Sequence, residues 1–137
     1  MDKERLITFF HQTNLITPSV ARTIAEQFDY KSIAKNQFHL VEGTLCDQYL
    51  FLERGYMRAF AHDTLGNEVT TSFYAPGQVV FEVSSFFERT KSLENIQALS
   101  DCEGWFITYA QLNTLFHSLP EFREFGRSML VKGFSPI

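Results

Sequence analysis

Apolar and polar residues alternate through most of the middle of the chain, and Gly, Asn and Asp residues separate the alternating runs. A period of two is typical of strands that bury one face, and these residue types favour the turns between strands. Strands of this length and spacing predict a sandwich or a jelly roll. We expect strands at residues 32–36, 38–42, 48–53, 56–62, 68–74, 95–100 and 104–109, with a hairpin turn at 63–67.

The first residues have helical spacing instead. Residues 2–13 carry apolar side chains at Leu6, Ile7, Phe9 and Phe10, which predicts a short amphipathic helix. A second helix should run from Pro18 to about Phe28, because Thr17 offers a capping oxygen and Pro18 lacks the amide hydrogen that has no partner there. We expect both helices to be packing elements.

Helical spacing returns after the last strand. Thr108 is the predicted cap of a helix at residues 109–117, and Pro120 begins a further helix. Charged residues occupy one side of this last helix. The opposite face carries Phe122, Phe125 and Met129, and the helix is interrupted by Gly133, Ser135 and Pro136.

Length and composition indicate one globular domain with an aromatic core. A chain of 137 residues can bury such a core without disulfides, and fifteen Phe, five Tyr and one Trp supply it. We divide the chain into N-terminal helices at residues 1–29, a roll at 30–109, and C-terminal helices at 110–137.

The charge distribution and the cysteines limit the binding partners and the cellular compartment that we expect for this protein. The formal net charge is −4 and the Lys and Arg residues are scattered, whereas nucleic-acid binding needs a basic stripe. We therefore expect these residues alone to bind no nucleic acid. Without a signal peptide or an apolar run of membrane length, we also expect no membrane partner. Cys46 and Cys102 fit no disulfide or metal-ligand pattern, which predicts a cytoplasmic protein without a cofactor.

The sequence contains no catalytic motif. A jelly roll can carry a metal-dependent cupin enzyme, but cupin sites need His-x-His with a Glu nearby, and the four histidines are isolated. Gly-x-Ser-x-Gly, Walker and His-Glu-x-x-His motifs are also missing. We expect no enzymatic activity and keep a cupin-type enzyme as the third hypothesis. The histidines, expected to be exposed or half-buried, are His11, His39, His62 and His117.

The most specific pattern lies between residues 74 and 98. A Pro76-Gly77 turn is followed by a short apolar run with one carboxylate, Glu82, then by a polar loop and another strand. This layout resembles the phosphate-binding cassette of cyclic-nucleotide-binding domains. The ordered turns before it also resemble that family, with Asn36 where a Gly is usual; Asn tolerates the left-handed conformation of such a turn. The resemblance implies a mainly β fold with flanking helices, a double-stranded β-helix or jelly roll.

The family's cassette binds its nucleotide through three groups. A Glu binds the ribose hydroxyl, amides at the start of a short helix bind the cyclic phosphate, and an Arg neutralises that phosphate. Glu82 matches the first group, but Phe81 replaces the Gly before it. The Arg position holds Ser92, followed by Leu93 and Glu94. The resemblance therefore implies a nucleotide scaffold without its phosphate chemistry, because a desolvated anion without a cation is strongly disfavoured.

Two alternatives remain open at the cassette. Glu82 is either a ligand group or a capping carboxylate at a helix start. The positive charge that the family's Arg provides is either absent from this chain or supplied from the loop by Arg89 or Lys91. We expect a pocket between residues 81–87 and the strand that begins at residue 92, suited to an uncharged or apolar effector. Its candidate residues are Phe81, Glu82, Val83, Ser84, Ser92 and Leu93.

The resemblance implies a regulatory, ligand-sensing domain of a Crp/Fnr-type bacterial transcription regulator that does not bind cAMP in the usual way. Such a domain would take a small-molecule effector, form a homodimer, and reach DNA only through a further C-terminal domain. The second hypothesis is a structural homodimerisation module with a collapsed pocket, which would pair through the Phe122 face of the last helix.

Overall fold

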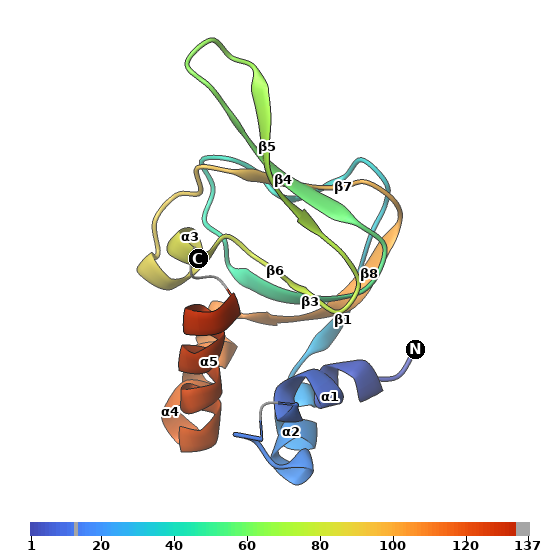
Figure 1. Cartoon of the computed structure of the whole chain (residues 1–137), viewed down its shortest axis with the longest axis vertical. Coiled ribbons are helices and arrows are strands. Elements are labelled where there is room, and N and C mark those ends of the chain that lie inside the picture. Colours follow the sequence, from blue (N-terminus) through green and yellow to red (C-terminus); the bar gives the residue numbers. More distant parts are fainter. Residues whose placement is uncertain (13, 134–137) are drawn as a thin grey trace. The chain divides into compact units, whose positions relative to one another are not determined.

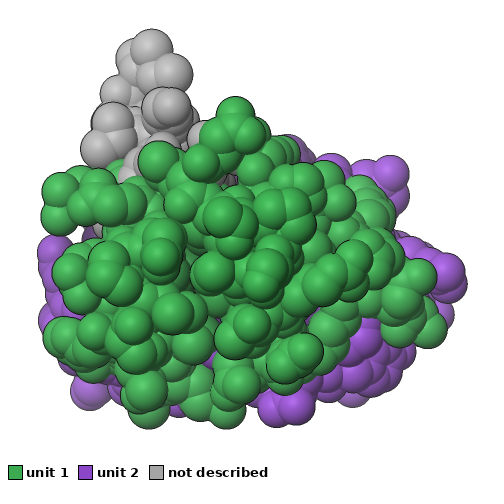
Figure 2. Space-filling view, turned by 90° about the horizontal axis from the view of Figure 1, so that it is seen from below, with its two compact units in different colours: residues 1–28, 110–137 green, residues 29–109 purple. Residues whose placement is uncertain are grey.

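The computed structural model describes residues 1–12 and 14–133, with side chains up to residue 127. The chain forms two compact units, which Figure 2 colours separately. One unit contains residues 1–28 and 110–137, and the other contains residues 29–109. Our division of the chain into three domains remains a prediction.

The unit of residues 29–109 is built from two four-stranded antiparallel sheets (Figure 1). One sheet has the order β1-β8-β3-β6 and the other the order β2-β7-β4-β5. This arrangement confirms the predicted mainly β jelly roll with flanking helices. The strands are β1 (Asp29–Ile33), β2 (Phe38–Leu40), β3 (Gln48–Arg54), β4 (Met57–His62), β5 (Glu68–Tyr74), β6 (Val79–Val80), β7 (Asn95–Ala98) and β8 (Cys102–Thr108), and a short helix, α3 (Val83–Glu88), follows β6.

The start of the roll differs from the prediction. We expected a strand at residues 32–36, but β1 pairs with β8 from Asp29 to Ile33. The chain turns immediately afterwards, where the amide of Gln37 donates to the carbonyl of Ala34 at 3.0 Å. Asn36 has the left-handed conformation that we predicted for it, with φ 74°. A regular strand has negative φ angles, so β1 cannot continue through Asn36.

The hairpin between β4 and β5 follows its local sequence. The Asp63 carboxylate accepts hydrogen bonds from the amides of Leu65 and Asn67, both at 2.9 Å, which fixes the predicted turn. However, the alternation in β5 does not bury a face, since Val69 is 47% exposed and Phe73 is 69% exposed. The reason is that β5 is the edge strand of its sheet, in a hairpin that extends beyond the neighbouring strands (Figure 1).

The helical unit is centred on Phe10. Its ring lies 5.4–5.6 Å, centroid to centroid, from the rings of Phe28, Phe122 and Phe125. The expected cap is present, because Thr17 accepts a hydrogen bond from the amide of Val20 at 3.3 Å. The helices that contribute to this unit are α1 (Glu4–His11), α2 (Pro18–Ala25), α4 (Tyr109–Ser118) and α5 (Pro120–Gly133).

One expectation about the helices is wrong: the second helix ends at Ala25 rather than at about Phe28, and Phe28 is buried just after it. The second hypothesis would pair two copies through the Phe122 face. Phe122 and Phe125 are covered within the unit, 2% and 1% exposed, so these two side chains do not offer a free surface. Thr13, the Met129 side chain, Ser135 and Pro136 lie outside the described residues. Within the described part of the chain, no helix has the length and apolar character needed to span a membrane.

Candidate functional site

Glu82 caps the helix that follows it. It has the extended backbone of an N-cap residue, with φ −93° and ψ 109°. Its carboxylate accepts hydrogen bonds from the amide of Ser84 at 3.2 Å and from that of Ser85 at 2.9 Å. The capping alternative for Glu82 is therefore the one in the structure, and the first free amides of α3 already have an anionic partner.

Ser85 fixes α3 to the segment before β3. Its fully buried hydroxyl accepts a hydrogen bond from the amide of Cys46 at 2.8 Å and donates to the carbonyl of Thr90 at 2.6 Å. The amide of Glu82 donates to the Cys46 sulfur at 3.4 Å. These bonds hold the start of α3 in place without a ligand.

Ser92, at the family's Arg position, uses its polar groups within the fold. Its backbone donates to the carbonyl of Thr44 and accepts from the amide of Gly43, both at 2.8 Å. Its hydroxyl donates to the carbonyl of Glu94 at 2.7 Å and accepts from the amide of the same residue at 3.0 Å. The residue is 1% exposed, so it offers a ligand neither a charge nor an accessible donor.

The two cations of the cassette loop behave differently. Arg89 lies at the end of α3, where its guanidinium contacts the Asp47 carboxylate at 2.6 Å and lies over the Tyr109 ring at 3.9 Å. It also donates to the carbonyl of Phe86 at 3.1 Å. Lys91 is exposed, and its side chain has no hydrogen bond or ion pair within the described residues. Arg89 therefore neutralises Asp47 and does not fill the vacant Arg role.

Carboxylates dominate the charge around the cassette. Burial first, then the carboxylate of Glu94 and, more weakly, that of Glu82 raise the pKa of Tyr74 to about 12. Burial raises the pKa of the Cys46 thiol, and Glu82 and Asp47 add to the effect. Each shift disfavours one more negative charge at this place, which is what a cyclic phosphate would bring.

The six predicted site residues do not share one environment. Phe81 is buried, with its ring 5.1 Å from that of Tyr49 and 5.3 Å from that of Phe86. Leu93 is 80% exposed, Val83 is half-buried and Ser84 is exposed. The chain segment at residues 43–46 contacts both parts of the predicted site. Cys46 binds α3 at Ser85, and Gly43 and Thr44 bind the backbone of Ser92. Their role in binding a ligand remains a prediction.

Two residues at this place were not predicted from the sequence. Tyr74 ends the strand before the Pro76-Gly77 turn, and this position at the edge of the cassette could have identified it as a neighbour of the site. Cys46 lies 36 residues before Glu82, and only the fold brings the two together. The four histidines are exposed or half-buried, as expected. No group of three His, Cys, Asp or Glu residues among the described residues could hold a metal ion.

Residues 30–118 match the family model of the cyclic nucleotide-binding domain, and this chain belongs to that family. No curated protein matches the chain.

Solved structures show the same fold at low sequence identity. The catabolite activator protein of Thermus thermophilus is 17% identical with a TM-score of 0.79, and the match covers 92% of this chain and 57% of that one. The N-terminal domain of a transcriptional regulator from Streptomyces coelicolor A3(2) is 12% identical, with a TM-score of 0.78 and coverage of 95% and 91%. The sensor domain of the regulator DNR from Pseudomonas aeruginosa is also 12% identical, with a TM-score of 0.73 and coverage of 94% and 84%. The chain thus spans less than two thirds of the length of the first of these proteins and most of the two isolated domains.

Proposed function

We propose that this chain is the regulatory, ligand-sensing domain of a Crp/Fnr-type transcription regulator, and that it does not bind cyclic nucleotides through a phosphate cradle. The family match and the fold shared with regulator sensor domains support the first part. The hydrogen bonds of Glu82 support the second part, because the helix amides that would bind a phosphate are occupied by a side chain of the protein itself.

The charges point the same way. A phosphate at the cassette would stand near the Glu94 and Glu82 carboxylates, with Ser92 in place of the neutralising Arg. Desolvating an anion beside two carboxylates without a cation costs several kcal/mol, which is enough to remove ordinary binding. An uncharged or apolar effector at residues 81–84 and 92–93 avoids this cost. The domain would act in the cytoplasm as part of a homodimer, and it would reach DNA through a segment other than the one described.

Calorimetric titration with cAMP and cGMP tests the proposal. We expect no binding by the unchanged protein at millimolar nucleotide. Lys91→Ala and Arg89→Ala should also show none, because neither cation serves a phosphate. Micromolar binding that Glu82→Ala abolishes would refute the proposal. Binding that Lys91→Ala alone abolishes would show that the loop supplies the cation after all.

The second candidate is an interaction module whose pocket is filled by its own side chains. The packing of Phe81 among Tyr49, Phe86 and Phe87, with ring centroids 5.1–5.9 Å apart, favours it. A crystal structure of the protein without added ligand distinguishes the two candidates. Unassigned density beside Phe81 supports the sensor, whereas a sealed aromatic cluster supports the module. Metal analysis of the purified protein tests the cupin-type enzyme, which would retain a bound metal.

A further inference from the structure

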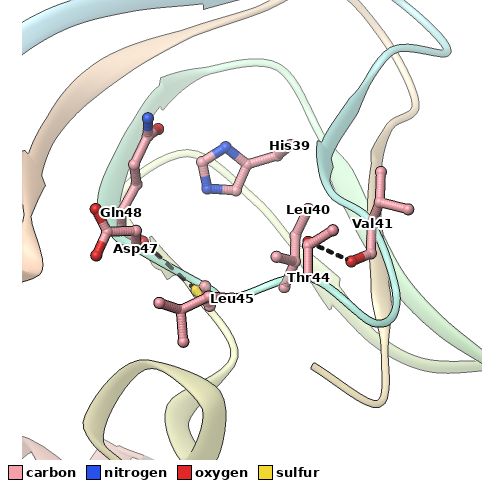
Figure 3. A pocket seen from close by; sticks show the side chains of 8 residues that line it. His39, Leu40, Val41, Thr44, Leu45, Asp47 and Gln48 are labelled. Carbon is pink, nitrogen blue, oxygen red and sulfur yellow. Dashed lines mark hydrogen bonds between the residues drawn. The ribbon is translucent and has the colours of Figure 1, made fainter. Parts of the chain in front are cut away.

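A pocket of about 240 Å³ lies on the β-sheet unit, and none of the six predicted site residues lines it. It is lined by residues 39–41 at the end of β2 and by residues 44–48 leading into β3. Figure 3 shows the His39 ring extending from its strand toward the side chain of Gln48. Leu40, Val41 and Leu45 give the pocket apolar walls.

An ammonium group contacts two of the lining side chains. Lys31 of β1 donates to Oε1 of Gln48 and lies 3.3 Å from Nδ1 of His39, and it faces the ring of Phe106 at 5.7 Å. The part of the chain that the structure describes places no carboxylate within ion-pair distance of Lys31. Lys31 is therefore a half-buried cation without a counter-ion, and burial lowers its pKa.

The neighbours of Lys31 present donors to the pocket. An ammonium can only donate, so Nδ1 of His39 accepts, and the ring hydrogen lies on Nε2. Burial, and then Lys31, lower the pKa of His39 to about 3, which keeps the ring neutral. By the same reasoning Oε1 of Gln48 accepts, which leaves its NH₂ group as a donor.

Two polar side chains that line the pocket have partners within the fold. The Asp47 carboxylate is paired with Arg89 at 2.6 Å. Thr44 donates its hydroxyl hydrogen to the carbonyl of Val41 at 2.6 Å. A cation and donors beside apolar walls complement a ligand with one anionic acceptor group and a short apolar part.

We propose that this pocket binds a small organic monocarboxylate. The carboxylate faces Lys31, His39 and Gln48, and the apolar part packs on Leu40, Val41 and Leu45. The ligand supplies the counter-ion that Lys31 lacks, so binding offsets the unfavourable burial of that charge. The six predicted cassette residues are not among these contacts, so failure of this proposal would leave the proposed function unaffected.

Hexanoate and benzoate are suitable probes, with hexanamide and benzamide as uncharged matches of the same shape. Calorimetry and amide shifts of the ¹⁵N-labelled protein measure their binding. We expect the carboxylates to bind at millimolar concentration or below, at least about tenfold tighter than the amides, with shifts at residues 39–48. Equal binding of both kinds, shifts confined to residues 82–93, or no carboxylate binding at all would overturn the proposal.

Three variants of the whole chain sharpen the test. Lys31→Met keeps the apolar stem and should weaken hexanoate about tenfold or more, whereas Lys35→Met removes an exposed charge and should leave it unchanged. Gln48→Glu places a carboxylate beside Lys31, so it should abolish binding while the fold is retained. This variant decides the question if Lys31→Met does not fold. Unchanged hexanoate affinity in Gln48→Glu would contradict the proposal.

Discussion

The cassette and the pocket lined by residues 39–41 and 44–48 lie in one β-sheet unit but have opposite electrostatic character. Around the cassette, the Glu82 and Glu94 carboxylates raise the pKa of Tyr74, Ser92 carries no charge, and the amides at the start of α3 are used within the fold. Beside the pocket, Lys31 has no carboxylate partner among the described residues, and its neighbours His39 and Gln48 present donors. A shared fold therefore does not determine where an anion can bind, because the fold positions the backbone while individual side chains set the charge.

The two regions should also differ in how much the fold is destabilised when a polar side chain is removed. The cassette's polar groups have partners inside the protein, so their removal should destabilise the fold. Beside the pocket, Lys31 has no counter-ion among the described residues, so the removal of its charge should cost little. This difference predicts a graded series of effects on stability, largest for Ser85 and smallest for Lys31.

Ser85→Ala should have the largest effect. It removes a fully buried hydroxyl and leaves the amide of Cys46 and the carbonyl of Thr90 without their partner. Each buried group left unsatisfied costs on the order of 1–3 kcal/mol, so we expect a loss of about 3 kcal/mol in urea unfolding. The exposed neighbour provides the control: Ser84→Ala should change stability by less than about 0.5 kcal/mol. Equal effects of the two variants would show that Ser85 does not fix α3.

Tyr74 should make stability fall in alkaline solution. Its pKa is about 12 in the folded protein and 10.0 in its ordinary state, so the unfolded chain loses the phenol proton first. The stabilisation is complete below pH 10 and is lost as pH rises through 12, with about 2 kcal/mol lost by pH 12. Tyr74→Phe should reduce this loss, measured as unfolding free energy between about pH 9 and pH 11. A slope unchanged by Tyr74→Phe would mean that the phenol is not buried beside the carboxylates.

Features set by neighbouring residues could be predicted from the sequence. The Asp63 turn, the Thr17 cap and the left-handed Asn36 each depend on contacts within a few residues, and each is present as expected. For Glu82, the sequence left two roles open. The positions of two amides show the capping contacts, and its role in binding a ligand remains a prediction.

Features that depend on strand register could not be predicted. Lys31, His39 and Gln48 come from three strands, and β8 lies between two of those strands in one sheet. No spacing in the sequence marks them, because their juxtaposition follows from the pairing of both sheets. Arg89 illustrates the same limit, since its partner Asp47 is 42 residues away.

Glu82→Ala should cost about 1 kcal/mol, the usual contribution of an N-cap side chain. The amides of Ser84 and Ser85 lose their acceptor, although water can replace it at the exposed Ser84. Glu88→Ala makes the same charge change at the exposed last residue of α3 and should cost less than about 0.5 kcal/mol. A thermal unfolding comparison of the two variants isolates the cap from the charge. Indistinguishable midpoints would argue against the capping role.

Lys31→Met should have the smallest effect, within about 1 kcal/mol of the unchanged protein at neutral pH and of either sign. The variant loses the hydrogen bonds to His39 and Gln48 but no longer buries an unpaired charge, and the methionine stem can still pack near Phe106. The pH dependence gives the sharper measurement. Because the folded pKa of Lys31 lies below its ordinary 10.5, the unfolded chain binds more protons just below that pH. The unchanged protein should therefore gain stability relative to Lys31→Met as pH rises toward 10.5, whereas Lys35→Met should show no such trend. A large loss of stability in Lys31→Met at neutral pH would mean that this ammonium has a strong partner, and the contrast between the pocket and the cassette would not hold.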